Sequence, residues 1–144
     1  NIIEASILSG VTIKKVSDVY VAAEVLLEQG CRAVLIKGGH MVGEQAVDLL
    51  FTPDKPMASF SSNFIKTANL HGTGCTVSSA ITAFLARGYE LPQAIALAKQ
   101  YVTSAILAGK DVFTGYGNGP LNHFFDPQPM IIYHNENDAE LKLK

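Results

Sequence analysis

The run from His71 to Thr76, His-Gly-Thr-Gly-Cys-Thr, joins two glycines, a thiol and the start of a helix. Glycine lacks a Cβ, so this turn can adopt tight or left-handed conformations and bring its amide N–H groups close to a ligand. The positive end of a helix that begins here would face the turn, so the two together suit a phosphate group. Apolar residues at helical spacing predict that helix, ending near Gly88: Val77, Ala80, Ile81, Phe84 and Leu85.

Competing catalytic motifs fail on detail. The chain has no Walker A sequence, because Gly109-Lys110 is followed by Asp111 and lacks the upstream glycine. The dinucleotide fingerprint is also broken, since Val77 stands where a third glycine is required after the glycine turn. The two cysteines, Cys31 and Cys75, form no CxxC pair for zinc. The glycine turn therefore remains the strongest chemical signal of the chain.

Composition limits the partners that this protein can have. The 144 residues are 48% hydrophobic and carry a formal net charge of −2. This length supports one domain with a substantial core. The charge balance lacks the basic character that nucleic acids and anionic membranes attract, so we expect neither as a partner. Without a membrane-length apolar stretch, a signal pattern or a disulfide framework, we expect a cytoplasmic protein.

Three helices are predicted besides the one after the glycine turn. The first covers about residues 1–8. The second is expected to be capped by Ser17, and its apolar stripe ends at Gly30. The third begins near Pro92, a residue favoured in the first turn of helices, and ends at Gly109.

Short strands occupy the middle of the chain. Residues 33–36 form a continuous apolar run, as expected for a strand buried on both faces, and lead into Lys37-Gly38-Gly39. Further strands are predicted at 46–51 and 57–60, with 64–67 as a candidate fourth. Helices and a small sheet in this order imply a layered α/β fold. Ligands in such folds sit beyond the carboxyl ends of the strands, where Lys37 and the glycine turn both fall.

Three stretches of the chain, taken in order, match the sequence pattern of a known family. They are Asn1-x-x-Glu4, the strand that ends Val34-Leu35-Ile36-Lys37-Gly38-Gly39-His40, and the run from Thr67 to Ile81. Together they resemble the hydroxymethylpyrimidine and phosphomethylpyrimidine kinases of thiamine synthesis, which belong to the ribokinase-like superfamily. The resemblance continues in order to about Phe125. Gly-Thr-Gly-Cys is its discriminating piece, because most sugar kinases of the superfamily have aspartate where Cys75 stands.

The resemblance implies a ribokinase-like layered α/β sandwich, of which we expect this chain to be the C-terminal half. Residues 1–130 would be that part of the kinase domain, and 131–144 a polar C-terminal tail. The chain opens on Asn1, without a methionine and within a helical pattern. We therefore expect a longer parent whose N-terminal half holds most of the acceptor pocket. The expected macromolecular partner is a complementing N-terminal half or a second copy in a homo-oligomer.

The resemblance also implies phosphoryl transfer, in which the protein mainly positions two substrates and neutralises charge. The backbone amides of Gly72, Thr73, Gly74 and Cys75 would hold the transferring phosphoryl group. Cys75 would take the proton of the substrate's hydroxymethyl group, since a helix N-terminus favours the thiolate that acts as a base. By itself, a cysteine at a helix start is more often a small packed residue.

ATP and Mg²⁺ are the cofactors that the resemblance implies. Lys37 would lie on the nucleotide phosphates as a point charge, although a lysine after a strand can equally be a solvated strand end. Glu4 would organise Mg²⁺ through water, with Asn1 beside it, because Mg²⁺ keeps most of its waters. Thr67 and Val102 would border the nucleotide.

The function implied for the intact parent is ATP-dependent phosphorylation of 4-amino-5-hydroxymethyl-2-methylpyrimidine and then of its monophosphate. The isolated segment is expected to be weak or inactive. A pyridoxal kinase with the same Gly-Thr-Gly-Cys turn is the alternative within enzymes. A non-catalytic nucleotide-binding remnant is the alternative from a different class.

Overall fold

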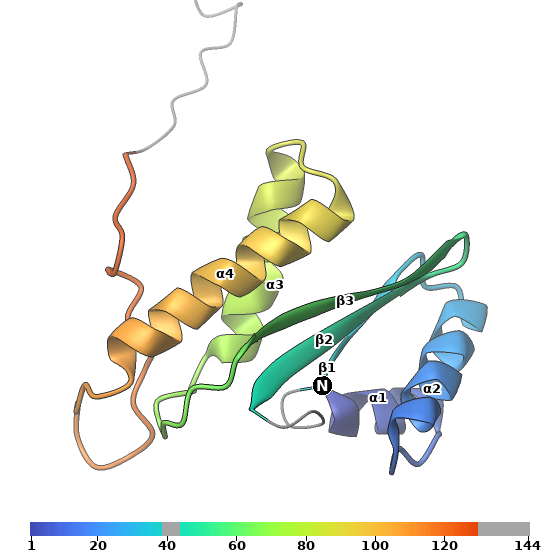
Figure 1. The fold of residues 1–144 in the computed structure, drawn as a ribbon, viewed down its shortest axis with the longest axis horizontal. Coiled ribbons are helices and arrows are strands. Elements are labelled where there is room, and N and C mark those ends of the chain that lie inside the picture. Colours follow the sequence, from blue (N-terminus) through green and yellow to red (C-terminus); the bar gives the residue numbers. More distant parts are fainter. Residues whose placement is uncertain (39–43, 130–144) are drawn as a thin grey trace, which may run out of the picture.

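The computed structural model describes residues 1–38 and 44–129 of the chain. Helices precede and follow a small sheet, as Figure 1 shows. The elements are α1 (Ile2–Ser9), α2 (Val16–Glu28), β1 (Val34–Lys37), β2 (Gln45–Thr52), β3 (Lys55–Asn63), α3 (Thr73–Ala86) and α4 (Leu91–Gly109). The expected α/β class is therefore confirmed.

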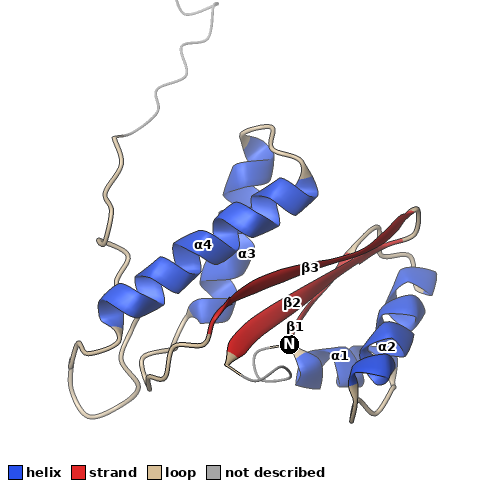
Figure 2. Ribbon diagram, in the orientation of Figure 1, coloured by secondary structure: helices blue, strands red, loops and turns tan. Residues whose placement is uncertain are grey.

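The sheet has three antiparallel strands in the order β1-β2-β3. Helices α1 and α2 lie on one side of it and the α3–α4 pair lies on the other (Figure 2). The expectation that residues 33–36 are buried on both faces is wrong. In β1, Val34 and Ile36 are buried while Leu35 is only half-buried, because neighbouring residues of a strand face opposite sides of the sheet.

The second and third strands are longer than expected, and the candidate fourth strand at 64–67 does not exist. Thr52 pairs with Lys55 across a two-residue hairpin, so β2 and β3 pair to their ends. Residues 64–67 run as a loop towards the glycine turn. There the Thr67 hydroxyl donates to the carbonyl of Lys110 at 2.9 Å. A contact with the end of α4 thus takes the place of strand pairing.

The start of α2 also differs from the expected Ser17 cap. The N-cap is Lys15, and α2 begins at Val16. The carboxylate of Asp18 accepts hydrogen bonds from the amides of Lys14 at 2.9 Å and Lys15 at 3.0 Å. These bonds, the one from Lys14 first, hold the pKa of Asp18 below its ordinary value. The helix is therefore anchored by a side chain from inside its first turn.

Buried apolar residues gather in two places. Seven of them, from α1, α2, β1 and β2, form a cluster: Ala5, Val19, Ala23, Leu26, Val34, Ile36 and Phe51. Helix α4 buries its own stripe, consisting of Ala94, Ile95, Ala98, Val102, Ala105 and Gly109. Helix α3 contains no buried residue. Lys99 of α4 and Asp48 of β2 join this helix to the sheet through an ion pair of 2.6 Å.

Some expectations fall outside the described residues. They are the end of the Lys37-Gly38-Gly39-His40 stretch and the polar tail at 131–144. Among the helices that the structure describes, none is long and apolar enough to cross a membrane.

Candidate functional site

The glycine turn places Gly72 at the N-cap of α3. Gly72 has a φ of 87°, a left-handed conformation that glycine adopts without strain. No described side chain caps α3, and its first turn carries no acidic residue. The Thr73 hydroxyl instead donates backwards to the carbonyl of Leu70 at 2.8 Å. The first amides of α3 have no acceptor within their own helix, so this end presents N–H donors and a positive dipole to an anion.

Lys37 brings a positive charge to the same place. A Cβ added to Gly74 would lie 3.4 Å from the Lys37 ammonium nitrogen, so the two residues are neighbours. Asp48 lies opposite Lys37 across the β1–β2 pair. That carboxylate is already paired with Lys99. Among the described residues no carboxylate forms an ion pair with Lys37, and its charge is directed at the glycine turn.

A cavity of about 250 Å³ adjoins this point. Four residues expected from sequence line it: Asn1, Lys37, Thr73 and Val102. Val102 is buried and supplies an apolar wall, while Lys37 and Thr73 supply polar groups. Thr67 is not among the lining residues, and its hydroxyl is engaged with the carbonyl of Lys110. The cavity therefore combines an apolar wall with polar and charged groups, which include the Lys99–Asp48 ion pair as well as Lys37.

Asn1 and Glu4 form a reciprocal capping box at the start of α1. The Asn1 side chain accepts from the Glu4 amide at 3.0 Å, and the Glu4 carboxylate accepts from the Asn1 nitrogen at 2.6 Å. Glu4 is an exposed carboxylate, and Lys37 is close enough for its positive charge to favour the ionised form.

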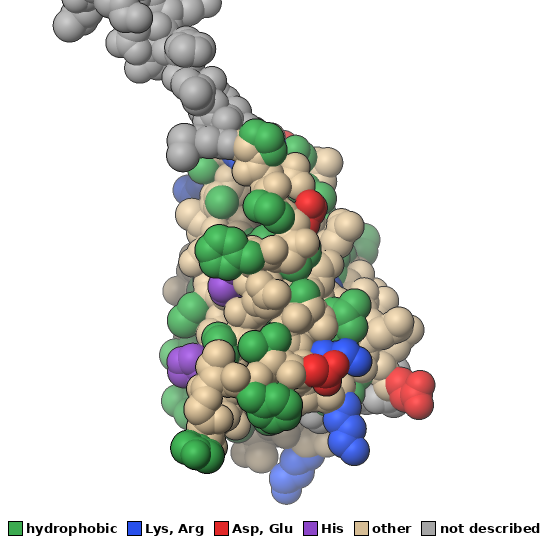
Figure 3. Space-filling model, turned by 90° about the vertical axis from the view of Figure 1, so that its left-hand side faces the viewer, with side chains coloured by type: hydrophobic (Ala, Val, Ile, Leu, Met, Phe, Trp, Pro, Cys, Tyr) green, Lys and Arg blue, Asp and Glu red, His purple; other side chains and the backbone are tan. Residues whose placement is uncertain are grey.

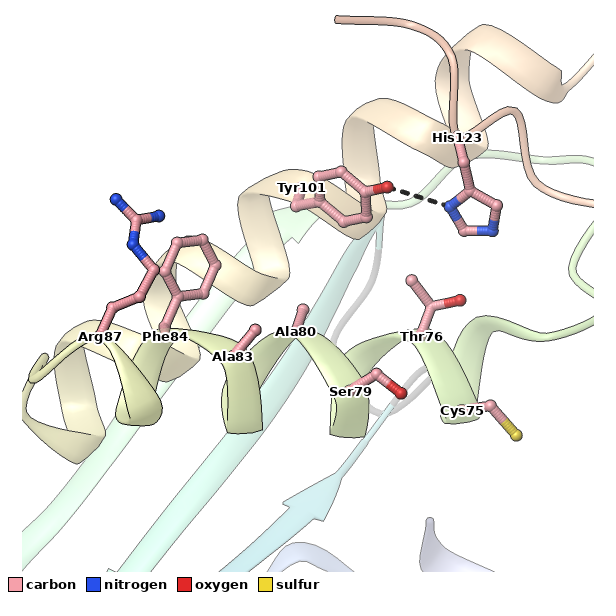
Figure 4. A pocket seen from close by; sticks show the side chains of 9 residues that line it. All are labelled: Cys75, Thr76, Ser79, Ala80, Ala83, Phe84, Arg87, Tyr101 and His123. Atoms are coloured by element: carbon pink, nitrogen blue, oxygen red, sulfur yellow. Dashed lines mark hydrogen bonds between the residues drawn. The ribbon is translucent and has the colours of Figure 1, made fainter. Parts of the chain in front are cut away.

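Cys75 lies at the N-terminal end of a second cavity, of about 500 Å³, along one flank of α3. Its side chain is exposed. In Figure 4 the Cys75 sulfur points away from Tyr101 and His123, which lie across the cavity from Thr76 and Ala80. The Tyr101 hydroxyl and His123 Nδ1 are 3.1 Å apart. The thiol is therefore accessible at the glycine turn but lies on a different flank of α3 from the Lys37 cavity.

Two polar groups near the site are not among the site residues predicted from the sequence. Asn69 is a buried polar residue, and its side chain bonds three backbone groups between residues 109 and 119. Lys99 and Asp48 are 51 residues apart and form a shielded ion pair beside the cavity. Asn69 lies within the run from Thr67 to Ile81, but neither that run nor the spacing of Asp48 and Lys99 indicates the partners, which only the fold reveals.

The chain is similar to known kinases. The phosphomethylpyrimidine kinase family matches residues 1–122. The hydroxymethylpyrimidine/phosphomethylpyrimidine kinase of Rhizobium meliloti is 41% identical over 125 residues, which cover 86% of this chain and 47% of that protein. The thiamine biosynthesis bifunctional protein ThiED of Geobacter sulfurreducens is 44% identical over 123 residues, covering 85% of this chain and 24% of that protein.

The fold is shared with solved kinases. A Bacillus subtilis pyridoxal kinase, solved as an ADP complex, superposes with a TM-score of 0.74 and 39% identity. The match covers 85% of this chain and 47% of that one. The expected ribokinase-like α/β fold is thereby confirmed.

The chain spans about half the length of the monofunctional relative and of the solved kinase. The expectation that this span is the C-terminal half of the kinase is not borne out by these matches, which give only its extent. The family assignment itself is independent of that question, because the match covers residues 1–122 and includes the glycine turn, Lys37 and Glu4. The chain belongs to the phosphomethylpyrimidine kinase family.

Proposed function

We propose that this chain supplies the phosphoryl-transfer part of a kinase that phosphorylates 4-amino-5-hydroxymethyl-2-methylpyrimidine, and then its monophosphate, at the expense of ATP. The observation that carries the proposal is the position of the Lys37 ammonium group beside Gly74, in a turn that opens α3 without a side-chain cap. A cation and a set of helix N-terminal amides at one point form a site for a phosphoryl group in transfer.

The proposed roles follow from this arrangement. The amides of Gly72, Thr73, Gly74 and Cys75 hold the oxygens of the transferring group and gain strength as negative charge develops. Lys37 neutralises the nucleotide phosphates. Asn1 and Val102 line the nucleotide's cavity. Thr67 acts on the nucleotide only indirectly, because its hydroxyl braces the loop before the turn.

Cys75 is proposed as the base. Its thiolate takes the proton of the hydroxymethyl group, the alcohol oxygen forms a bond to phosphorus, and the bond between phosphorus and the leaving ADP oxygen breaks. The exposure of Cys75 on the flank of α3 opposite the Lys37 cavity is compatible with an acceptor approaching from that side. The rest of the acceptor pocket belongs to the part of the kinase outside this chain.

Glu4 fits a water-mediated role towards Mg²⁺. It is an exposed carboxylate near the charge of Lys37, and the described residues contain no group of three metal-ligating side chains. Magnesium keeps several waters and accepts one or two carboxylates, so one ionised carboxylate near the phosphate site suffices. When bound, the metal would neutralise charge on the nucleotide phosphates.

The decisive test is ATP-dependent phosphorylation by the full kinase that carries this sequence. With Cys75→Ala we expect kcat to fall about 100-fold or more, within the range of losing a general base. Lys37→Met should raise the KM for ATP and lower kcat. Cys31→Ala is the matched control, because Cys31 is an exposed cysteine away from the turn and should leave both constants unchanged. Unchanged turnover in Cys75→Ala would exclude Cys75 as the base.

Pyridoxal kinase remains the second candidate, because the Bacillus subtilis enzyme that shares this fold carries that name and is 39% identical. Turnover of pyridoxal and of the hydroxymethylpyrimidine by the same preparation separates the two activities. Nucleotide binding without transfer to either alcohol would instead support a non-catalytic remnant.

A further inference from the structure

We infer that Asn69 is a positioning residue that holds the phosphate-binding turn against the end of α4 and the segment that follows it. The inference rests on the proposed role of the turn in phosphoryl transfer. Asn69 lies in the loop between β3 and α3, three residues before Gly72. Asn69 is 8% exposed, and among the residues that the structure describes it is the only polar one that is buried.

The Asn69 side chain uses its donors and its acceptor on three separate backbone groups. Nδ2 donates to the carbonyl of Gly109, the last residue of α4, at 2.8 Å. The same nitrogen donates to the carbonyl of Val112 at 2.7 Å. Oδ1 accepts from the amide of Gly119 at 2.9 Å. One side chain therefore ties together the helix end, the loop after it and the returning segment.

The surrounding backbone is shaped to receive this amide group. A Cβ on Gly119 would overlap the Asn69 side chain, and a Cβ on Gly109 would lie 2.8 Å from the Asn122 nitrogen. Both glycines are therefore required for close approach rather than for a special backbone angle. Neither Gly109 nor Gly119 could therefore be replaced by a residue with a side chain unless the neighbouring atoms moved.

The anchor is connected to the glycine turn by short links. The amide of Asn69 donates to the Thr67 hydroxyl at 3.1 Å, and that hydroxyl donates to the carbonyl of Lys110. Beyond Asn69, the carbonyl of Leu70 accepts the Thr73 hydroxyl at 2.8 Å. His71 pairs with Pro120, next to the Gly119 that Asn69 binds. Loss of the Asn69 side-chain bonds would leave the turn held against this segment by these links alone.

Only an amide fits this set of partners. Two carbonyl oxygens require donors, and the Gly119 amide requires an acceptor. Aspartate has the same shape but no donor, and it would place a negative charge against two carbonyls and beside the proposed anion site. Asn69→Asp is therefore the most informative variant, because it changes the chemistry of the contact and nearly preserves its volume.

The test compares Asn69→Asp with Asn118→Ala in the full kinase that carries this sequence. Asn118 is an exposed asparagine of the same held segment, which makes it a matched control. For Asn69→Asp we expect kcat to fall about 100-fold, similar to the loss of one oxyanion donor, with a smaller change in the KM for ATP. Hydrogen exchange of the amides at 72–76 should accelerate, while Asn118→Ala leaves kcat and exchange unchanged.

A milder variant keeps the test decisive if Asn69→Asp does not fold. Thr67→Val removes the hydroxyl that links Asn69 to Lys110, and we expect faster exchange at 72–76 and a several-fold lower kcat. Unchanged exchange and unchanged kcat, in whichever of the two variants folds, would overturn the inference. Absence of kinase activity in the unaltered protein would contradict the proposed function instead, and the exchange rates would still report whether Asn69 holds the turn.

Discussion

The two sides of the sheet are built differently. On one side, α2 buries Val19, Ala22, Ala23 and Leu26 against the sheet. On the other side, α3 buries no residue, although it carries an apolar stripe of the same kind. The face formed by α4 and the following segment shows scattered apolar side chains together with histidine side chains (Figure 3). The helix proposed to hold the phosphoryl group at its N-terminus is thus the one with no buried residue, and it packs against α4, which buries six.

Matched isoleucine substitutions would show the largest difference between the two sides. Ile36 in β1 is 3% exposed and belongs to the buried cluster, whereas Ile81 in α3 is only half-buried. We expect Ile36→Ala to lower the free energy of unfolding by about 2–5 kcal/mol, and Ile81→Ala by about 1 kcal/mol. Urea unfolding followed by circular dichroism measures both. Equal losses would show that α3 contributes as much to the core as β1 does.

The ion pair that joins α4 to strand β2 gives the next effect. Its side chains are only 13% and 14% exposed, for Lys99 and Asp48 respectively. Asp48→Ala leaves the Lys99 charge shielded from water and without its partner, so we expect a loss of about 2–4 kcal/mol. The double variant Asp48→Leu/Lys99→Met should recover most of it, because the unpaired charge is also removed. A double-mutant cycle from urea unfolding checks this, and additive losses would contradict a coupled pair.

The smallest expected effect is a pH dependence at the start of α2. The amides of Lys14 and Lys15 lower the pKa of Asp18 in the folded state. The ionised carboxylate therefore stabilises the folded state at any pH above the pKa that Asp18 has in the unfolded chain. That contribution is lost as the pH falls through the lower, folded pKa. Asp18→Asn should therefore lower the Tm near pH 7 and differ less from the unaltered chain near pH 2. A difference in Tm that stayed constant from pH 7 to pH 2 would argue against a carboxylate anchor.

Local patterns allowed good predictions where neighbours in sequence decide the structure. The helix after the glycine turn and the helix from Pro92 to Gly109 were expected nearly where α3 and α4 lie, because periodicity and terminal residues are local signals. The Ser17 cap was wrong, since α2 begins at Val16 with Lys15 as its N-cap, and Asp18 binds the amides of Lys14 and Lys15 that precede the helix. The strand at 64–67 was also wrong, because Thr67 bonds to the distant Lys110.

The sequence by itself determined the family, the α/β class, the glycine turn at the start of α3 and the identity of Lys37, Glu4 and Cys75 as candidates. These depend on residue types at short spacings. Only the tertiary structure decided that Lys37 lies beside Gly74, that Lys99 pairs with Asp48 and that Asn69 holds Gly109, Val112 and Gly119. Each of these contacts joins residues about 37 or more positions apart, and no periodicity along the chain encodes which distant polar groups folding brings together.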